Sequence, residues 1–92
     1  MKDSLGLYYF PHAGNNKARV YVRRNDGELE FRLWLAEAPE AWEKHGWLPL
    51  SVIHEAARLY AQEKRTGDPT ILYDEQVAEA LLAEDEKGRG LM

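Results

Sequence analysis

The stretch ARVYVRRNDGELEFRLWL, from Ala18 to Leu35, constrains the fold more than any other part of the chain. Two runs of β-forming residues flank Asp26-Gly27, a dipeptide whose residues adopt positive φ readily in a tight turn. A two-residue loop there pairs Asn25 with Glu28 and, further along, residues whose numbers sum to 53. The stretch therefore predicts a β-hairpin, with a four-residue loop in the same register as the alternative.

This register sorts the hairpin side chains into two chemically distinct faces. One face pairs Val22 with Phe31 and Val20 with Leu33. A slip of one residue would set Val22 against Glu30 and mix polar with apolar side chains on both faces, so we reject it. The other face carries one opposite-charge pair and two pairs of arginine with an aromatic ring: Arg23 with Glu30, Arg32 with Tyr21, and Arg19 with Trp34.

A further strand is expected before the hairpin, over residues 5–10, where Pro11 ends the run LGLYYF. Leu7 and Tyr9 point to one side of that strand, and Tyr8 and Phe10 point to the other. Neither side is typical of a face that meets only water.

The rest of the chain has the spacing of helices. Pro39 can begin a short helix over 39–45, and Trp42 should pack on the sheet from it. A longer helix over 50–66 has a broad apolar stripe, with a stop at Gly67 and Pro69. Asp74 is a good N-cap for a third helix over 75–86. Residues 70–73 fit either an edge strand or an extended link.

Together these elements predict one small α+β domain over residues 1–92. A three-stranded antiparallel meander (about 5–10, 18–24 and 28–35) is followed by two or three helices (about 39–45, 50–66 and 75–86). Strands followed by helices favour this class over a doubly wound sheet. We expect the helices to pack on one sheet face and to cover its apolar side chains.

Composition narrows the class of protein. The hydrophobic content of 45% and charged content of 30% are ordinary for a globular chain in water. No apolar run is long enough for a membrane span, and the chain has no cysteine, so a cytoplasmic location is expected. The net charge of −4 lies entirely in the second half of the chain. This distribution argues against broad nucleic-acid binding, because nucleic-acid-binding surfaces are usually basic. The acidic second half gives weak support to another class, a protein that mimics nucleic acid.

No motif in the chain predicts catalysis, a metal ion or a cofactor. His54-Glu55 resembles the start of a zinc-protease helix, but Arg58 stands where the second histidine is required. His12 and His45 lie in other segments, without the spacing of metal ligands. The turn around Gly14 lacks the glycines and the following helix of a phosphate-binding loop. We therefore expect no enzyme activity, no bound metal, no cofactor and no small-molecule ligand.

The face opposite the apolar side is the candidate interaction surface. Arginine and aromatic side chains are enriched at the centres of protein interfaces, and they also hold single-stranded nucleic acids by stacking. Our first hypothesis is a small non-catalytic binding or regulatory protein that contacts a protein partner, or a second copy, through this face. The alternatives are a module that binds single-stranded nucleic acid and an ordinary solvated sheet face. The candidate residues are Tyr8, Phe10, Arg19, Tyr21, Arg23, Arg32 and Trp34.

Overall fold

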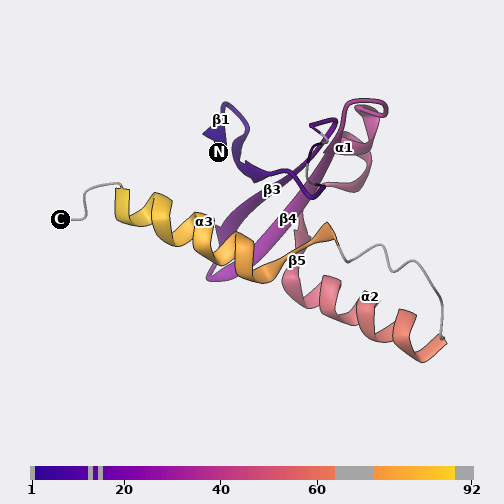
Figure 1. The fold of residues 1–92 in the computed structure, drawn as a ribbon. Coiled ribbons are helices and arrows are strands. Elements are labelled where there is room, and N and C mark those ends of the chain that lie inside the picture. Colours follow the sequence, from indigo (N-terminus) through magenta and orange to yellow (C-terminus); the bar gives the residue numbers. More distant parts are fainter. Residues whose placement is uncertain (1, 13, 15, 64–71, 89–92) are drawn as a thin grey trace.

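The computed structural model describes residues 2–12, 14, 16–63 and 72–88. Within these residues the chain forms one antiparallel sheet of five strands and three helices, which confirms the predicted α+β class (Figure 1). The strands are β1 (Lys2–Asp3), β2 (Gly6–Tyr9), β3 (Ala18–Asn25), β4 (Glu28–Leu35) and β5 (Leu48–Pro49). The helices are α1 (Glu40–His45), α2 (Leu50–Glu63) and α3 (Glu75–Gly88).

The central hairpin has the predicted register throughout. β3 and β4 pair from Asn25 opposite Glu28 to Ala18 opposite Leu35. The loop has two residues, Asp26 with φ 53° and Gly27 with φ 80°. Positive φ at both positions is the requirement of a type I′ turn, whose twist matches that of the strands. The turn and the alternation of side chains therefore specify the same pairing.

The sheet contains two strands beyond the predicted meander. The expected first strand is present as β2, which places Leu7 opposite Val22. β1 pairs with β2 to form a second, smaller hairpin, and β5 adds to the other edge with Leu48 opposite Phe31. Strand order follows chain order, β1-β2-β3-β4-β5. Strands of two residues leave no alternating pattern in a sequence, which is why β1 and β5 were not predicted.

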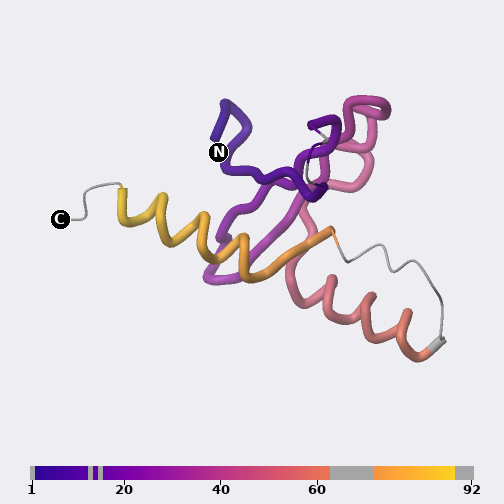
Figure 2. The backbone as a smooth tube through the Cα atoms, in the orientation of Figure 1, coloured from indigo at the N-terminus to yellow at the C-terminus, as the bar shows by residue number. Residues whose placement is uncertain are grey.

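The main core lies on the apolar face of the hairpin. Val20, Val22 and Phe31 are almost completely buried there, as the register predicts. α2 contributes Ile53 and α3 contributes Ala78 and Leu82 to the same cluster. In Figures 1 and 2, α3 lies across the strands, whereas α2 runs away from the sheet.

The helices do not all lie on one sheet face. α2 and α3 pack on the apolar face as expected, but Trp42 of α1 stacks on Tyr21, whose side chain points to the opposite face. α1 lies within the short connection between β4 and its edge neighbour β5. The Tyr21 ring and the Arg32 side chain offer Trp42 an aromatic and cationic surface on that face, which explains the departure from the expected arrangement.

The structure tests the predicted start of α3 but not the predicted end of the second helix. Asp74 caps α3 as expected, because its Oδ1 accepts hydrogen bonds from the backbone amides of Gln76 (3.0 Å) and Val77 (3.1 Å). The expected stop of the second helix at residues 66–69 lies outside the described residues. So do residues 70 and 71 of the uncertain segment, and Leu72 and Tyr73 are not part of the sheet. No helix in the described ranges has the length and apolar character needed to cross a bilayer.

Candidate interaction surface

The seven candidate residues do come together on one side of the sheet, which we call the aromatic–arginine face. Strand alternation puts the residues of β3 and β4 there, and Tyr8 of β2 lies opposite Tyr21. The ring of Phe10, just after β2, meets the Tyr8 ring edge to face at 5.6 Å between centroids. The face consists of Tyr8, Phe10, Arg19, Tyr21, Arg23, Arg32 and Trp34.

One half of this face is covered by the chain itself. The Trp42 ring packs edge to face on Tyr21, with 5.0 Å between centroids. The Arg32 guanidinium lies 3.9 Å from the Trp42 ring centroid, and Arg32 Nε donates a 2.9 Å hydrogen bond to the Trp42 carbonyl oxygen. As a result Tyr21 is 0% exposed. Tyr21 is therefore an internal packing residue and is not available to a partner.

Arg23 is also engaged within the chain. Its Nε donates a 2.6 Å hydrogen bond to Glu30 Oε1, the pair that the register predicted. Its guanidinium lies 4.3 Å from the ring centroid of Trp47, a contact that the sequence did not suggest. Trp47 and Trp42 lie 6.1 Å apart between ring centroids. Trp42 packs on the sheet as the sequence predicted, whereas no prediction was made for Trp47.

The other half of the face is built around Arg19. Its guanidinium lies between the rings of Tyr8 and Trp34, 4.8 Å from each centroid. Arg19 Nη1 donates hydrogen bonds to Asp3 Oδ2 (3.1 Å) and to the Tyr21 hydroxyl (3.3 Å). The Arg19 side chain remains 32% exposed. We call Tyr8, Arg19 and Trp34 the arginine sandwich, and all three are partly exposed. Arg23, in the other half of the face, is 45% exposed.

Asp3 holds this sandwich in place and was missed by sequence reasoning. The Tyr21 hydroxyl donates a 2.6 Å hydrogen bond to Asp3 Oδ2. Partial desolvation acts to raise the pKa of Asp3, but the hydrogen bonds from Tyr21 and the Leu5 amide and the charge of Arg19 outweigh it and lower that pKa. Burial, together with the hydrogen bond to Asp3, raises the pKa of Tyr21. At neutral pH the network is therefore a fixed ion pair with a neutral phenol.

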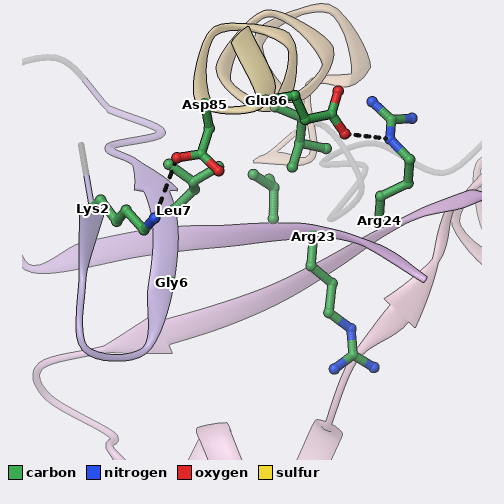
Figure 3. Close-up of a pocket in the computed structure, with 9 residues that line it drawn as sticks. Lys2, Gly6, Leu7, Arg23, Arg24, Asp85 and Glu86 are labelled. Carbon is green, nitrogen blue, oxygen red and sulfur yellow. Dashed lines mark hydrogen bonds and ion pairs between the residues drawn. The ribbon is translucent and has the colours of Figure 1, made fainter. Parts of the chain in front are cut away.

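A shallow pocket of about 240 Å³ lies on the apolar side of the sheet, between the first hairpin, β3 and the end of α3 (Figure 3). Its rim carries two ion pairs, Lys2 with Asp85 (3.2 Å) and Arg24 with Glu86 (3.3 Å). Arg24 also bonds Glu79 (3.2 Å), so the charges of the rim are matched within the chain. Figure 3 shows Arg23 pointing away from this pocket, toward the aromatic–arginine face. The pocket is therefore a weak candidate for a charged ligand.

Acidic and histidine side chains do not gather into a metal site in the part of the chain that the structure describes. His54 Nε2 on α2 lies 3.6 Å from Oε1 of Glu75, the first residue of α3. His12 and His45 lie on other segments.

The chain matches no family model, no curated protein and no solved structure. We therefore infer a function from the geometry of the aromatic–arginine face.

Proposed function

We propose that this chain is a small non-catalytic binding or regulatory protein of the cytosol, which contacts a partner protein through the arginine sandwich and the neighbouring Phe10. The observation that supports this most directly is the position of Arg19, fixed between two aromatic rings at 4.8 Å while still partly exposed. The four types of side chain in the sandwich and beside it, Tyr, Arg, Trp and Phe, are those enriched at the centres of protein interfaces.

Preorganisation favours such a role. A free arginine loses rotamer entropy when a partner immobilises it, at a cost of about 1 kcal/mol. Arg19 is already held by the Tyr8 and Trp34 rings and by the carboxylate of Asp3. Its Nε is buried and makes no hydrogen bond among the described residues. A partner surface that packs over Trp34 and Tyr8 would therefore bind an arginine that needs little further ordering.

Single-stranded nucleic acid remains the second candidate for the same face, because aromatic rings beside arginine can stack on bases. This hypothesis is weaker because the arginines of the face are already hydrogen-bonded within the chain. Arg19, Arg23 and Arg32 each donate to an oxygen of this chain. Phosphates would compete with those acceptors for the same guanidinium charge, whereas a protein partner can pack on the rings and leave the pairs intact.

The test is quantitative affinity capture from the native host with the whole chain as bait, read out by mass spectrometry. Trp34→Ala and Arg19→Ala are the test variants, and Arg58→Ala is the matched control. Arg58 is also an ion-paired, exposed arginine, bound to Glu55 at 2.5 Å on α2, away from the face. Circular dichroism and urea unfolding of each variant establish that it is folded.

The proposal predicts at least one protein whose recovery falls at least tenfold with Trp34→Ala and with Arg19→Ala, but not with Arg58→Ala. Recovery that is the same for all four baits contradicts it. Labelled single-stranded DNA and RNA are titrated in parallel at low and moderate salt. Binding with a steep salt dependence that Arg19→Ala weakens would replace the protein partner with nucleic acid.

A further inference from the structure

The arginine sandwich keeps several hydrogen-bond donors that the described part of the chain does not use. Arg19 Nη1 donates to Asp3 Oδ2 and to the Tyr21 hydroxyl, whereas Arg19 Nη2 donates to no atom of the described residues. The Tyr8 hydroxyl and the Trp34 indole N–H likewise make no hydrogen bond within those residues. All three side chains of the sandwich therefore have a donor without an acceptor.

These three donors are open to solvent. Among the described residues that are buried or partly exposed, the one buried side-chain nitrogen or oxygen atom without a hydrogen bond is Arg19 Nε. The unpaired donors Arg19 Nη2, Tyr8 Oη and Trp34 Nε1 are therefore not buried. The Arg19 side chain is 32% exposed, and Tyr8 and Trp34 are also partly exposed. A partner that packs on the sandwich can reach these atoms.

The chemistry of the open donors indicates which group a partner must bring. A guanidinium and an indole N–H can donate but cannot accept, so each requires an acceptor. A side-chain amide or hydroxyl would bring donors of its own beside the arginine. A carboxylate accepts only, with two oxygens, and its bond to a guanidinium is charge-assisted and therefore stronger than a neutral one. Among protein side chains, a carboxylate is thus the best match.

The neighbouring Asp3 favours a carboxylate over a phosphate. Asp3 Oδ2 lies 3.1 Å from Arg19 Nη1, so one negative charge is already present at this guanidinium. A guanidinium has five N–H donors, so a second carboxylate can bind through Nη2 and leave the Asp3 pair intact. A phosphate monoester would bring a charge of about −1.5 to −2 at pH 7 and would be repelled more strongly by Asp3.

We propose that the partner protein places an aspartate or glutamate side chain on the arginine sandwich, where the carboxylate accepts from Arg19 Nη2. This inference rests on the proposed function, because it names the group through which the partner binds. The rings of Tyr8 and Trp34 flank the guanidinium at 4.8 Å and shield the new bond from water, which strengthens it. Asp3 fixes the guanidinium, so the acid meets a donor that is already in position.

The test begins with random peptides displayed on phage and selected on the immobilised whole chain, with the Trp34→Ala chain for counter-selection. Peptides that need Trp34 bind at the sandwich, and they should share an aspartate or glutamate. Fluorescence anisotropy with synthetic versions then gives dissociation constants. Replacing the shared acid with its amide should weaken binding to the wild-type chain by about tenfold or more.

A double-mutant cycle shows whether Arg19 is the arginine that binds the acid. In the Arg19→Gln chain the same acid-to-amide change should alter the dissociation constant by less than about twofold. Arg58→Gln is the matched control, because Arg58 is an exposed, ion-paired arginine on α2, and it should leave the full effect. Circular dichroism checks that the variants fold. The indole N–H signal of Trp34 in NMR spectra of the wild-type chain needs no arginine variant, and the acid peptide should shift it further than the amide peptide.

The outcomes separate this inference from the proposed function. Peptides that need Trp34 but share no acid, or an acid whose effect is equally large in the Arg19→Gln chain, overturn the inference and leave the proposed function standing. If no selected peptide needs Trp34, both are contradicted. A peptide with phosphoserine in place of the acid is tested in parallel. Binding about tenfold tighter than that of the acid peptide, and lost with Arg19→Gln, would replace the carboxylate with a phosphate.

Discussion

The hydroxyl of Tyr21 donates a 2.6 Å hydrogen bond to Oδ2 of Asp3, and the same carboxylate oxygen accepts from Arg19 Nη1 at 3.1 Å. This bond joins the first hairpin to the middle of β3 on the aromatic–arginine face. It depends on β1, a strand of two residues at the sheet edge. The exposed part of the face is therefore held in position from beneath by a buried phenol and from the side by a carboxylate.

Tyr21→Phe should lower the free energy of unfolding at pH 7 by about 1 to 2 kcal/mol, because Asp3 Oδ2 loses the hydrogen bond from the Tyr21 hydroxyl and keeps the longer one from Arg19 Nη1. The lowered pKa of Asp3 means that its contribution is complete above about pH 4 and is lost as the pH falls through the folded-state pKa. The difference in stability between pH 7 and pH 3, measured by urea unfolding, should shrink in the variant.

Tyr8→Phe is the control for that experiment. Tyr8 lies on the same face, and its ring packs on Tyr21 at 5.2 Å between centroids, but the substitution keeps the ring. Its pH dependence should match that of the wild-type chain. An equal change in both variants would mean that the Asp3 bond contributes nothing specific.

Tyr9 should make the protein sensitive to alkali. Its hydroxyl donates to the Leu72 carbonyl oxygen at 2.6 Å and accepts from the Asp74 amide at 2.8 Å, so it fixes the start of α3 to the sheet. Burial raises the pKa of Tyr9 to about 12. A raised acid pKa favours the protonated fold, so this stability is complete below about pH 10 and is lost as the pH rises toward 12.

Tyr9→Phe should therefore cost about 1 to 2 kcal/mol at pH 7 and reduce the loss of stability between pH 9 and pH 11. Burial also raises the pKa of Tyr73, so the alkaline loss should shrink without vanishing. Urea midpoints at the two pH values and the tyrosinate absorbance measure both effects. A variant with the wild-type slope would show that Tyr9 titrates normally.

Trp42→Ala should destabilise the fold by about 2 to 3 kcal/mol, because it uncovers Tyr21 and removes the ring on which the Arg32 guanidinium packs. Trp42→Phe keeps an aromatic ring there and should cost less than half as much. Lys44→Ala on the same helix is the control and should stay within about 0.5 kcal/mol of wild type. Urea unfolding monitored by near-ultraviolet circular dichroism distinguishes the three.

Gly27→Ala should cost about 1 kcal/mol, because Gly27 has φ 80° and a Cβ is strained in that region. Asp26→Asn is the control at the other turn position, φ 53°, which asparagine adopts readily, and it should be neutral within about 0.5 kcal/mol. Thermal unfolding of both variants measures the difference. If Gly27→Ala is neutral as well, the type I′ geometry of the turn is incorrect.

The features predictable from the sequence were those set by neighbouring residues. The turn dipeptide and the alternation of side chains specify the β3–β4 register, and with it the pairs Arg23–Glu30 and Arg19–Trp34. The N-cap at Asp74 is equally local. Each of these relations compares a few residues within one hairpin or one helical turn.

The features that escaped prediction depend on where short segments dock. Nothing in the pattern of residues 36–47 indicates which sheet face Trp42 will cover, so the burial of Tyr21 could not be deduced. Arg32 was assigned to Tyr21, but Trp42 supplies the ring on which its guanidinium packs. Asp3 lies in a strand too short to show a period. The sequence therefore predicted which side chains share this side of the sheet, but not which of them the chain itself covers.

The strand order β1-β2-β3-β4-β5 also bears on how the chain folds. Each strand pairs with the strand next to it in the sequence, so the sheet can assemble without first closing a long loop. Isolated β-hairpins form in about 1 to 10 µs. The contacts that span most of the chain include those of α3 with β2 and β3, such as the ion pair of Arg24 with Glu86. We therefore expect the contacts of the last helix with the sheet to form later in folding than the strand pairs.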